Sequence, residues 1–219
     1  MSEQLTIYSP YKKLADTWAA PNLEDVPRLM RDYLMLMPTA EFPQQIETND
    51  NPRARLVKYL YWDVPLPLEQ PMPTVQQRQS IIFNPFQPVV APDPERGYRV
   101  FSQAFVTQAQ TKAQTILRIF MGDAAFISPY ESSINVEFHI LSNTTLDTNT
   151  REMALARTYG MEVAIIQALA GVHMAGVGTF HFYRSRMIGD DQQNVGRMVL
   201  MQFYSMGGGT QEMPLLTNN

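Results

Sequence analysis

The chain has 219 residues, of which 45% are hydrophobic and 17% charged, and its formal net charge is −4 at neutral pH. This length is enough for one well-buried core, or for one domain that carries a substantial extra arm. The absence of cysteine excludes a disulfide scaffold, thiol catalysis and thiolate metal sites, and the 17 scattered basic residues give no electrostatic footprint for nucleic acid.

No segment of the sequence has the pattern of a membrane anchor or a signal peptide. The longest apolar run, residues 163–172, is interrupted by Gln167 and is far shorter than the roughly 18 residues that a membrane span needs. The first five residues contain neither a basic patch nor an apolar stretch. We therefore expect a globular protein of a reducing compartment, without membrane contact.

Residues 1–37 contain one short helix signal. Asn22 is a candidate N-cap, acidic residues follow it in the first turn, and Pro27 comes early enough to be tolerated. Apolar residues then recur at helical spacing as far as Pro38: Val26, Leu29, Met30, Tyr33, Leu34 and Met37. This pattern predicts a helix that faces the core, and a partner-binding helix is the alternative.

Eleven of the 16 prolines lie between residues 38 and 94. Because proline removes ladder donors and biases the preceding residue to extended geometry, we expect only brief strands there, at 55–62 and 79–83. The segment is too apolar for a disordered linker, so residues 38–97 are predicted to form a Pro-rich extended arm that packs on its own domain or on a neighbouring subunit. The candidate interface residues are the aromatic side chains of this arm: Tyr59, Tyr61, Trp62, Phe83 and Phe86.

Residues 98–206 have the pattern of a regular α+β core. Strands are expected at 98–108 and 114–121. Residues 133–140 alternate as a half-buried antiparallel strand does, with one apolar face formed by Ile134, Val136, Phe138 and Ile140.

One long helix follows this strand in the sequence. Asn149 and Glu152 form a candidate capping box at its start, and Gly171 is a natural stop. Two strands, at 177–188 and 196–206, should then close the core as an antiparallel hairpin. The predicted fold class is therefore α+β: an antiparallel sheet with one long helix packed on it, a short N-terminal helix, the extended arm and a flexible C-terminal tail at residues 207–219.

Catalytic and metal-binding patterns are missing from the sequence. Glu137 and His139 point the same way on one expected strand, but the polar side of a half-buried sheet holds such residues routinely. His139, His173 and His181 lack the spacing of a metal site. The glycine run at 207–209 is followed by neither a helix nor a lysine, as a phosphate-binding loop would be. We predict no enzyme activity, no cofactor and no metal.

The order of elements in the α+β core resembles a known family. The passages that carry the resemblance are the strand at 134–141, the capped helix at 150–169, the turn at 171–176 and the final strand pair at 178–183 and 197–204. Together they resemble the tail terminator and head-tail joining (neck) proteins of tailed bacteriophages. The likeness covers about half of the chain and depends on element order rather than on a diagnostic motif, and the Pro-rich segment departs from the small members of that group.

The resemblance implies a structural virion protein without catalytic residues. Its members form rings of identical subunits, typically homohexamers, at the head-tail junction or the tail end. The implied partners are copies of the chain itself and the adjoining connector and tail-tube proteins, while DNA passes through the ring without specific binding. The implied location is the virion, after assembly in the cytoplasm of the host bacterium.

The composition agrees with a protein that contacts other proteins. The chain has 13 Arg but only 4 Lys, and Arg, Tyr and Met are favoured in contact patches whereas Lys is depleted. Ordinary compositional variation in a monomeric domain is the alternative explanation. Two other functions stay open: another tail or baseplate component, and a small α+β enzyme or ligand-binding domain with a pocket between helix and sheet near Glu137, His139, Tyr183 and Arg184.

Overall fold

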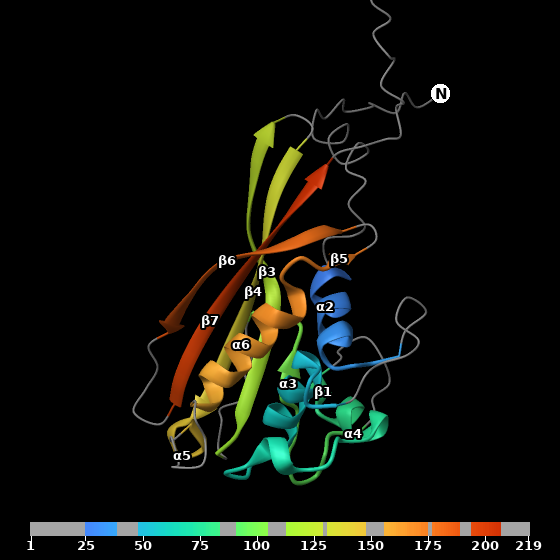
Figure 1. Ribbon diagram of the computed structural model, residues 1–219, viewed down its shortest axis with the longest axis vertical. Coiled ribbons are helices and arrows are strands. Elements are labelled where there is room, and N and C mark those ends of the chain that lie inside the picture. The colour runs from blue at the N-terminus through green and yellow to red at the C-terminus, as the bar shows by residue number, and fades with distance from the viewer. Residues whose placement is uncertain are drawn as a thin grey trace, which may run out of the picture.

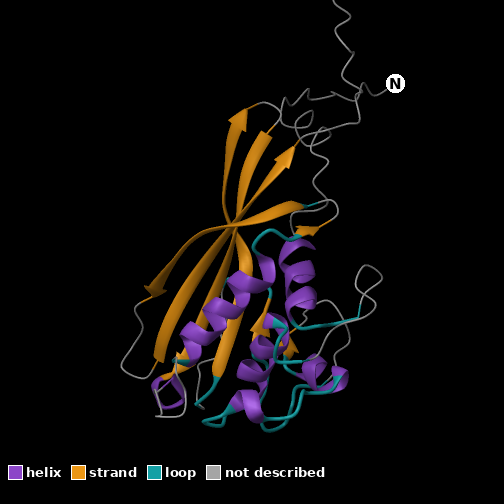
Figure 2. Ribbon diagram, viewed as in Figure 1, coloured by secondary structure: helices purple, strands orange, loops and turns teal. Residues whose placement is uncertain are grey.

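A mixed sheet with helices against one face forms the architecture, seen in a computed structural model that describes residues 25–38, 48–83, 91–104, 113–128, 131–147, 156–174, 177–188 and 194–206 (Figures 1 and 2). The helices are α2 (Val26–Leu34), α3 (Pro52–Tyr61), the 3-10 helix η2 (Pro67–Glu69), α4 (Val75–Ser80), α5 (Thr144–Asp147) and α6 (Arg157–Leu169). The strands are β1 (Ile82–Phe83), β2 (Val100–Phe101), β3 (Thr115–Ser128), β4 (Glu131–Asn143), β5 (His173–Met174), β6 (Gly178–Ile188) and β7 (Asn194–Met206).

Within the described residues the sheet has seven strands, in the order β1-β2-β3-β4-β7-β6-β5. The long strands β3, β4, β7 and β6 pair antiparallel and form its centre. Short pairings extend the sheet on both sides, through parallel β2 and β1 and through antiparallel β5. The predicted α+β class is confirmed, and so is the hairpin of β6 and β7.

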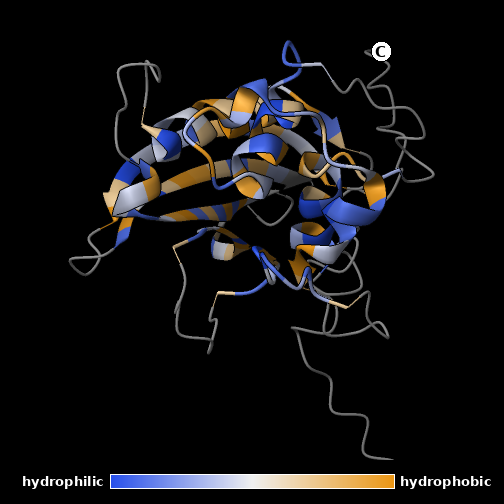
Figure 3. Ribbon diagram, turned by 90° about the horizontal axis from the view of Figure 1, so that it is seen from below, coloured by the Kyte–Doolittle hydropathy of each residue, from blue (hydrophilic) through white to orange (hydrophobic). Residues whose placement is uncertain are grey.

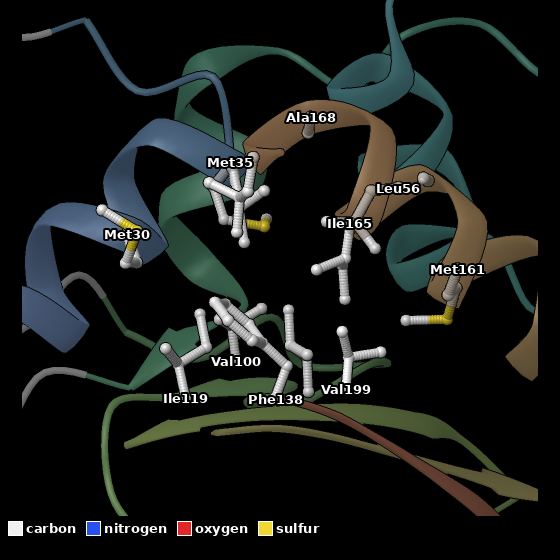
Figure 4. Packing of buried hydrophobic residues seen from close by; sticks show 14 of the residues in the cluster. Met30, Met35, Leu56, Val100, Ile119, Phe138, Met161, Ile165, Ala168 and Val199 are labelled. Carbon is white, nitrogen blue, oxygen red and sulfur yellow. The ribbon is translucent and has the colours of Figure 1, made fainter. Parts of the chain in front are cut away.

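The apolar alternation expected for β4 is present. Its even-numbered residues between 134 and 140 are fully buried, whereas Asn135, Glu137 and His139 between them are half-buried. Figure 4 shows Phe138 of this face, with Val199 of β7, pointing toward Ile165 of α6. One face of the central strands therefore forms the floor of the core, as period-2 alternation dictates.

Residues 52–80 contain the helices α3, η2 and α4, which corrects the expectation of an extended arm with strands at 55–62 and 79–83. Asn51 caps α3, since its side chain accepts a hydrogen bond from the Arg53 N–H at 3.0 Å, and Pro52 occupies the first helical position. Thr74 and Gln77 form a capping box at the start of α4. A proline at the start of a helix loses no hydrogen bond. Pro52 and Pro67 therefore start helices here, and of the expected second strand only β1 is present.

A single hydrophobic cluster joins these helices to the sheet. It contains Met30 and Met35 of the α2 region, Leu56 of α3, Ile165 of α6 and Val199 of β7, all fully buried (Figure 4). The expected segments 1–37, 38–97 and 98–206 thus share one core in the part of the chain that the structure describes. Residues 207–219 lie outside the part of the chain that the structure describes.

α6 is not the single long helix that the sequence predicted, because α2 and α3 share the same face of the sheet with it (Figure 2). The backbone of Ala156 is extended (φ −54°, ψ 145°), so α6 begins at Arg157. The Thr158 N–H donates to Asp147 Oδ1 at 2.6 Å, so the cap comes from α5. Asn149 and Glu152, the expected capping box, lie outside the described residues. Gly171 adopts a positive φ of 80° just after α6, which confirms the expected stop.

The side chain of Arg157, the first residue of α6, is buried against the end of α3. Its Nη1 donates to Tyr59 O at 2.8 Å and to Trp62 O at 2.7 Å, its Nη2 donates to Val64 O at 2.8 Å, and its Nε donates to Leu146 O at 3.3 Å. Burial lowers the pKa of this guanidinium from its usual value. The last carbonyls of a helix lack intrahelical partners and carry partial negative charge, so a fork of N–H donors suits this position.

Two further arginines bind the same helix end. Arg99 Nη1 donates to Leu60 O at 2.8 Å, and its guanidinium also forms a two-point ion pair with Asp63. Arg96 Nε donates to Tyr61 O at 3.0 Å. Both arginines lie just before β2, so they connect the end of α3 to the edge of the sheet.

Replacing Phe138 tests the assignment of the two sheet faces. Because Phe138 is fully buried, Phe138→Ala should lower the free energy of unfolding by about 3–5 kcal/mol. His139→Ala and Glu137→Ala, on the other face, should each cost about 0.5–1 kcal/mol. Urea denaturation followed by circular dichroism measures all three. A Phe138→Ala protein as stable as the other two would show that the faces are reversed.

Replacing Arg157 tests the cap on α3. Arg157→Met keeps much of the side-chain volume but leaves several carbonyls without a donor, and should lower the free energy of unfolding by roughly 3 kcal/mol or more. Arg157→Lys should recover only part of the loss, since an ammonium cannot reproduce the planar fork. Exposed Arg28→Met is the control, expected within about 0.5 kcal/mol of wild type. Equal denaturation midpoints for Arg157→Met and this control would refute the cap.

Candidate interaction surface

The aromatic residues of the Pro-rich segment were expected at an interface, and the structure buries the first two. Tyr59 and Tyr61 belong to the hydrophobic core. The Tyr59 ring lies against Gly160 of α6, where an added Cβ would come within 2.7 Å of the Tyr59 hydroxyl. Glycine at this position lets α3 and α6 approach closely, so the Tyr59 ring lies at the contact between the two helices.

Trp62 and Phe83 are half-buried. Trp62 Nε1 donates to Pro71 O at 3.0 Å, and the Phe83 ring centroid lies 5.6 Å from that of Phe101. Their place at an interface stays a prediction. Phe86 lies outside the described residues.

Of the five large hydrophobic side chains that are exposed among the described residues, three lie on β6, one on α6 and one on β7. Phe182, Tyr183 and Met187 are 44%, 58% and 70% exposed. Phe180, two residues before Phe182, is fully buried, and its ring centroid lies 5.2 Å from that of Phe203. β6 therefore leaves the core after Phe180 and presents apolar side chains to the outside.

The outer edge of β6 is open over most of its length. β5 pairs with it only at Gly178 and Thr179, and two backbone hydrogen bonds join Phe180 to Gly171 and Val172. Along residues 181–188, no described strand lies beside this edge. Such an edge presents backbone donors and acceptors that another strand can use.

The opposite edge of the central strands is open as well. β2 pairs with β3 only at Leu117 and Arg118, so no described strand lies beside the outer edge of β3 along residues 119–128. Asp123 is exposed on this edge, within a bulge between Met121 and Ala124. Figure 1 shows the end of β3, with the start of β4, extending past the helices.

Hydrophobic and hydrophilic residues alternate along the strands (Figure 3), and in β4 the polar residues Glu137 and His139 belong to the face away from α6. His139 Nε2 lies 2.9 Å from Glu137 Oε2, and the His139 ring packs edge-on against Phe120 at 4.8 Å. Phe138, between them in sequence, points toward the helices. Glu137 and His139 therefore cannot line a pocket between α6 and the sheet, which corrects that feature of the enzyme alternative.

On the same face, the polar side chains of Ser133, Gln202 and Tyr204 form hydrogen bonds with one another. Gln202 Nε2 donates to Ser133 Oγ at 2.5 Å, and the Tyr204 hydroxyl donates to Gln202 Oε1 at 3.1 Å. Among the described residues, no three or more His, Cys, Asp or Glu side chains come together in a way that could hold a metal ion. Paired polar side chains of this kind stabilise a sheet, and they offer no nucleophile beside a base.

A buried carboxylate fixes β6 from the helix side. Glu162 of α6 is buried, and its carboxylate accepts hydrogen bonds from Arg197 of β7 and Ser185 of β6. Arg197 also lies over the Tyr159 ring, 5.1 Å from its centroid. A buried carboxylate requires such partners, so the position of Ser185 at the centre of β6 is closely specified.

The comparisons with known proteins give no family for the chain. A scan against protein-family models finds no match, and no curated protein is similar to the sequence. Among the described residues, no helix combines the length and apolar character needed to cross a membrane.

Proposed function

We propose that this protein is a structural subunit that assembles with copies of itself into a ring, in the manner of the tail terminator or neck proteins of tailed bacteriophages. The ring would lie in the virion, at the head-tail junction or the tail end, between connector and tail-tube proteins. DNA would pass through it without specific binding, and the subunit would carry no enzyme activity.

The observation that carries this proposal is the open edge of β6 with exposed Phe182, Tyr183 and Met187. Neighbouring exposed apolar side chains favour association. An edge strand without a neighbour favours it too, because its backbone groups can extend a sheet into another chain. A contact made by one such edge leaves the other side of the subunit free to repeat it, which generates a ring when the rotation closes.

The polar groups of the described residues support a structural role over a catalytic one. Glu137 pairs with His139, Glu162 pairs with Arg197, and Gln202 pairs with its neighbours on the sheet. Each group has a partner that explains its position in the fold. The same surfaces fit another tail or baseplate component, so the position within the virion rests on the resemblance in element order.

Mass measurement tests the assembly. Native mass spectrometry of the full chain at tens of micromolar should give one closed species at a multiple of 25.0 kDa. Six copies would match the family that the sequence resembles. A 25.0 kDa monomer across ordinary salt concentrations would contradict the proposal, whereas an unlimited series of multiples would indicate an open filament.

DNA binding tests the proposed passage. Subunits with a net charge of −4 should have negligible affinity for duplex DNA at physiological salt, and weak binding at low salt should vanish steeply as salt rises. Fluorescence anisotropy with a labelled duplex measures this. Sub-micromolar binding that tolerates salt would contradict a passive passage and indicate a nucleic-acid-binding protein.

A further inference from the structure

We propose that the open edge of β6 in one copy pairs antiparallel with the open edge of β3 in the next copy, so that the sheet continues from subunit to subunit. This inference rests on the proposed function, since its occupant is a second copy of the chain. It goes further by naming the two surfaces and the charges that select them.

The strand directions permit this contact. β3 is antiparallel to β4, β4 to β7 and β7 to β6, so β6 runs opposite to β3. Copies related by rotation about an axis roughly along the strands keep these directions. β6 of one copy would then meet β3 of the next in the antiparallel sense that the central strands already have.

The charges on the two edges differ in sign. Arg184 and Arg186 are exposed on β6, and Asp123 is exposed on β3. Pairing β6 with β6 of another copy would bring arginines toward arginines, and like charges on facing strands are destabilising. Pairing β6 with β3 brings the arginines toward Asp123. Charge therefore selects the head-to-tail contact over a two-fold one.

The two open edges are staggered along the strands. Ser185, in the middle of the open β6 edge, is paired with Val199, which is paired with Phe138, which is paired with Ile119. Ile119 lies at the beginning of the open β3 edge, which continues to Ser128. Joining the two edges therefore requires a shift along the strand direction, and closing a sheet into a barrel requires a stagger of this kind.

Both edges contain a bulge. One lies between Phe182 and Arg184 on β6, and the other lies between Met121 and Ala124 on β3. Bulges and edge arginines are devices that hinder unselective strand pairing. On β6 they stand beside exposed apolar side chains, a combination that suits an edge meant for one complementary partner.

Charge reversal with rescue tests the contact. Arg186→Glu and Asp123→Arg, each alone, should weaken assembly of the full chain by about tenfold in dissociation constant, read by mass photometry across a dilution series. The double variant should regain most of the affinity, because the opposite charges again face each other. Arg28→Glu, an exposed arginine on α2, is the matched control and should assemble as wild type does.

Disulfide trapping gives an independent readout, because the chain has no cysteine. Met187 and Ala124 are exposed and both belong to the helix-side rows of their strands. Under mild oxidation, the double variant Met187→Cys with Ala124→Cys should give covalent multimers in steps of 25.0 kDa. A mixture of the two single variants should give only a heterodimer. The double variant Phe182→Cys with Ala124→Cys tests a second register, in which Phe182 rather than Met187 faces Ala124 of the next copy.

The outcomes separate the inference from the proposed function. Covalent dimers of Met187→Cys alone would indicate a two-fold β6 contact and overturn the inference. An intact ring by native mass spectrometry, with neither cysteine pair crosslinked and no rescue by the double charge variant, would overturn it while the proposed function stands. A wild-type chain that stays monomeric would contradict both the inference and the proposed function.

Discussion

The C-terminal end of α3 is the point on which the rest of the structure depends. A helix that ends inside a protein leaves carbonyl groups that must find donors, and here Arg96, Arg99 and Arg157 supply them. Arg157 opens α6, and Arg99 directly precedes β2. Satisfying one helix end therefore also fixes where the next helix begins and where the sheet gains its outer strands. An apolar cluster without this polar constraint would leave α3 free to slide over the sheet, since hydrophobic contact is not directional.

α6 connects the C-terminal end of α3 to the exposed strand β6. Arg157 attaches the start of α6 to the end of α3, and five residues later Glu162 binds Arg197 and Ser185 of the sheet, so α6 is held at two charged points. Ser185 belongs to β6, whose outer edge is open. An edge that is held in place before association loses less conformational entropy when it binds. The buried charges therefore do more than stabilise the core, because they give the exposed strand a defined shape.

Local pattern was enough to predict β4 and α2, because there a regular apolar period coincides with the buried face. It was enough for the β6 and β7 hairpin because two strand-forming runs flank a polar loop sequence. It was not enough for residues 52–80, where prolines suggested strand breaks although Thr74 and Gln77 had the spacing of a capping box. The contact between Arg157 and Trp62 joins residues 95 positions apart, and no local period encodes it. The open edge of β6 was missed for the same reason: alternation predicts a strand, whereas the strand order decides which strand has a free side.

The aromatic residues of the Pro-rich segment and the exposed residues of β6 illustrate how apolar composition differs from apolar surface. Tyr59 and Tyr61 were predicted at an interface because a compact domain seemed too small to cover them, yet α3 turns them inward. The helices α2, α3 and α6 cover one face of the central strands, and that cover does not reach Phe182 and Met187 at the sheet edge. Polar residues at these two positions would cost a monomer little, and bulges and arginines already guard the edge against unselective pairing. In the proposed contact between copies, the apolar side chains would supply attraction while the bulge and the arginines exclude other strands, so that both act on the same strand.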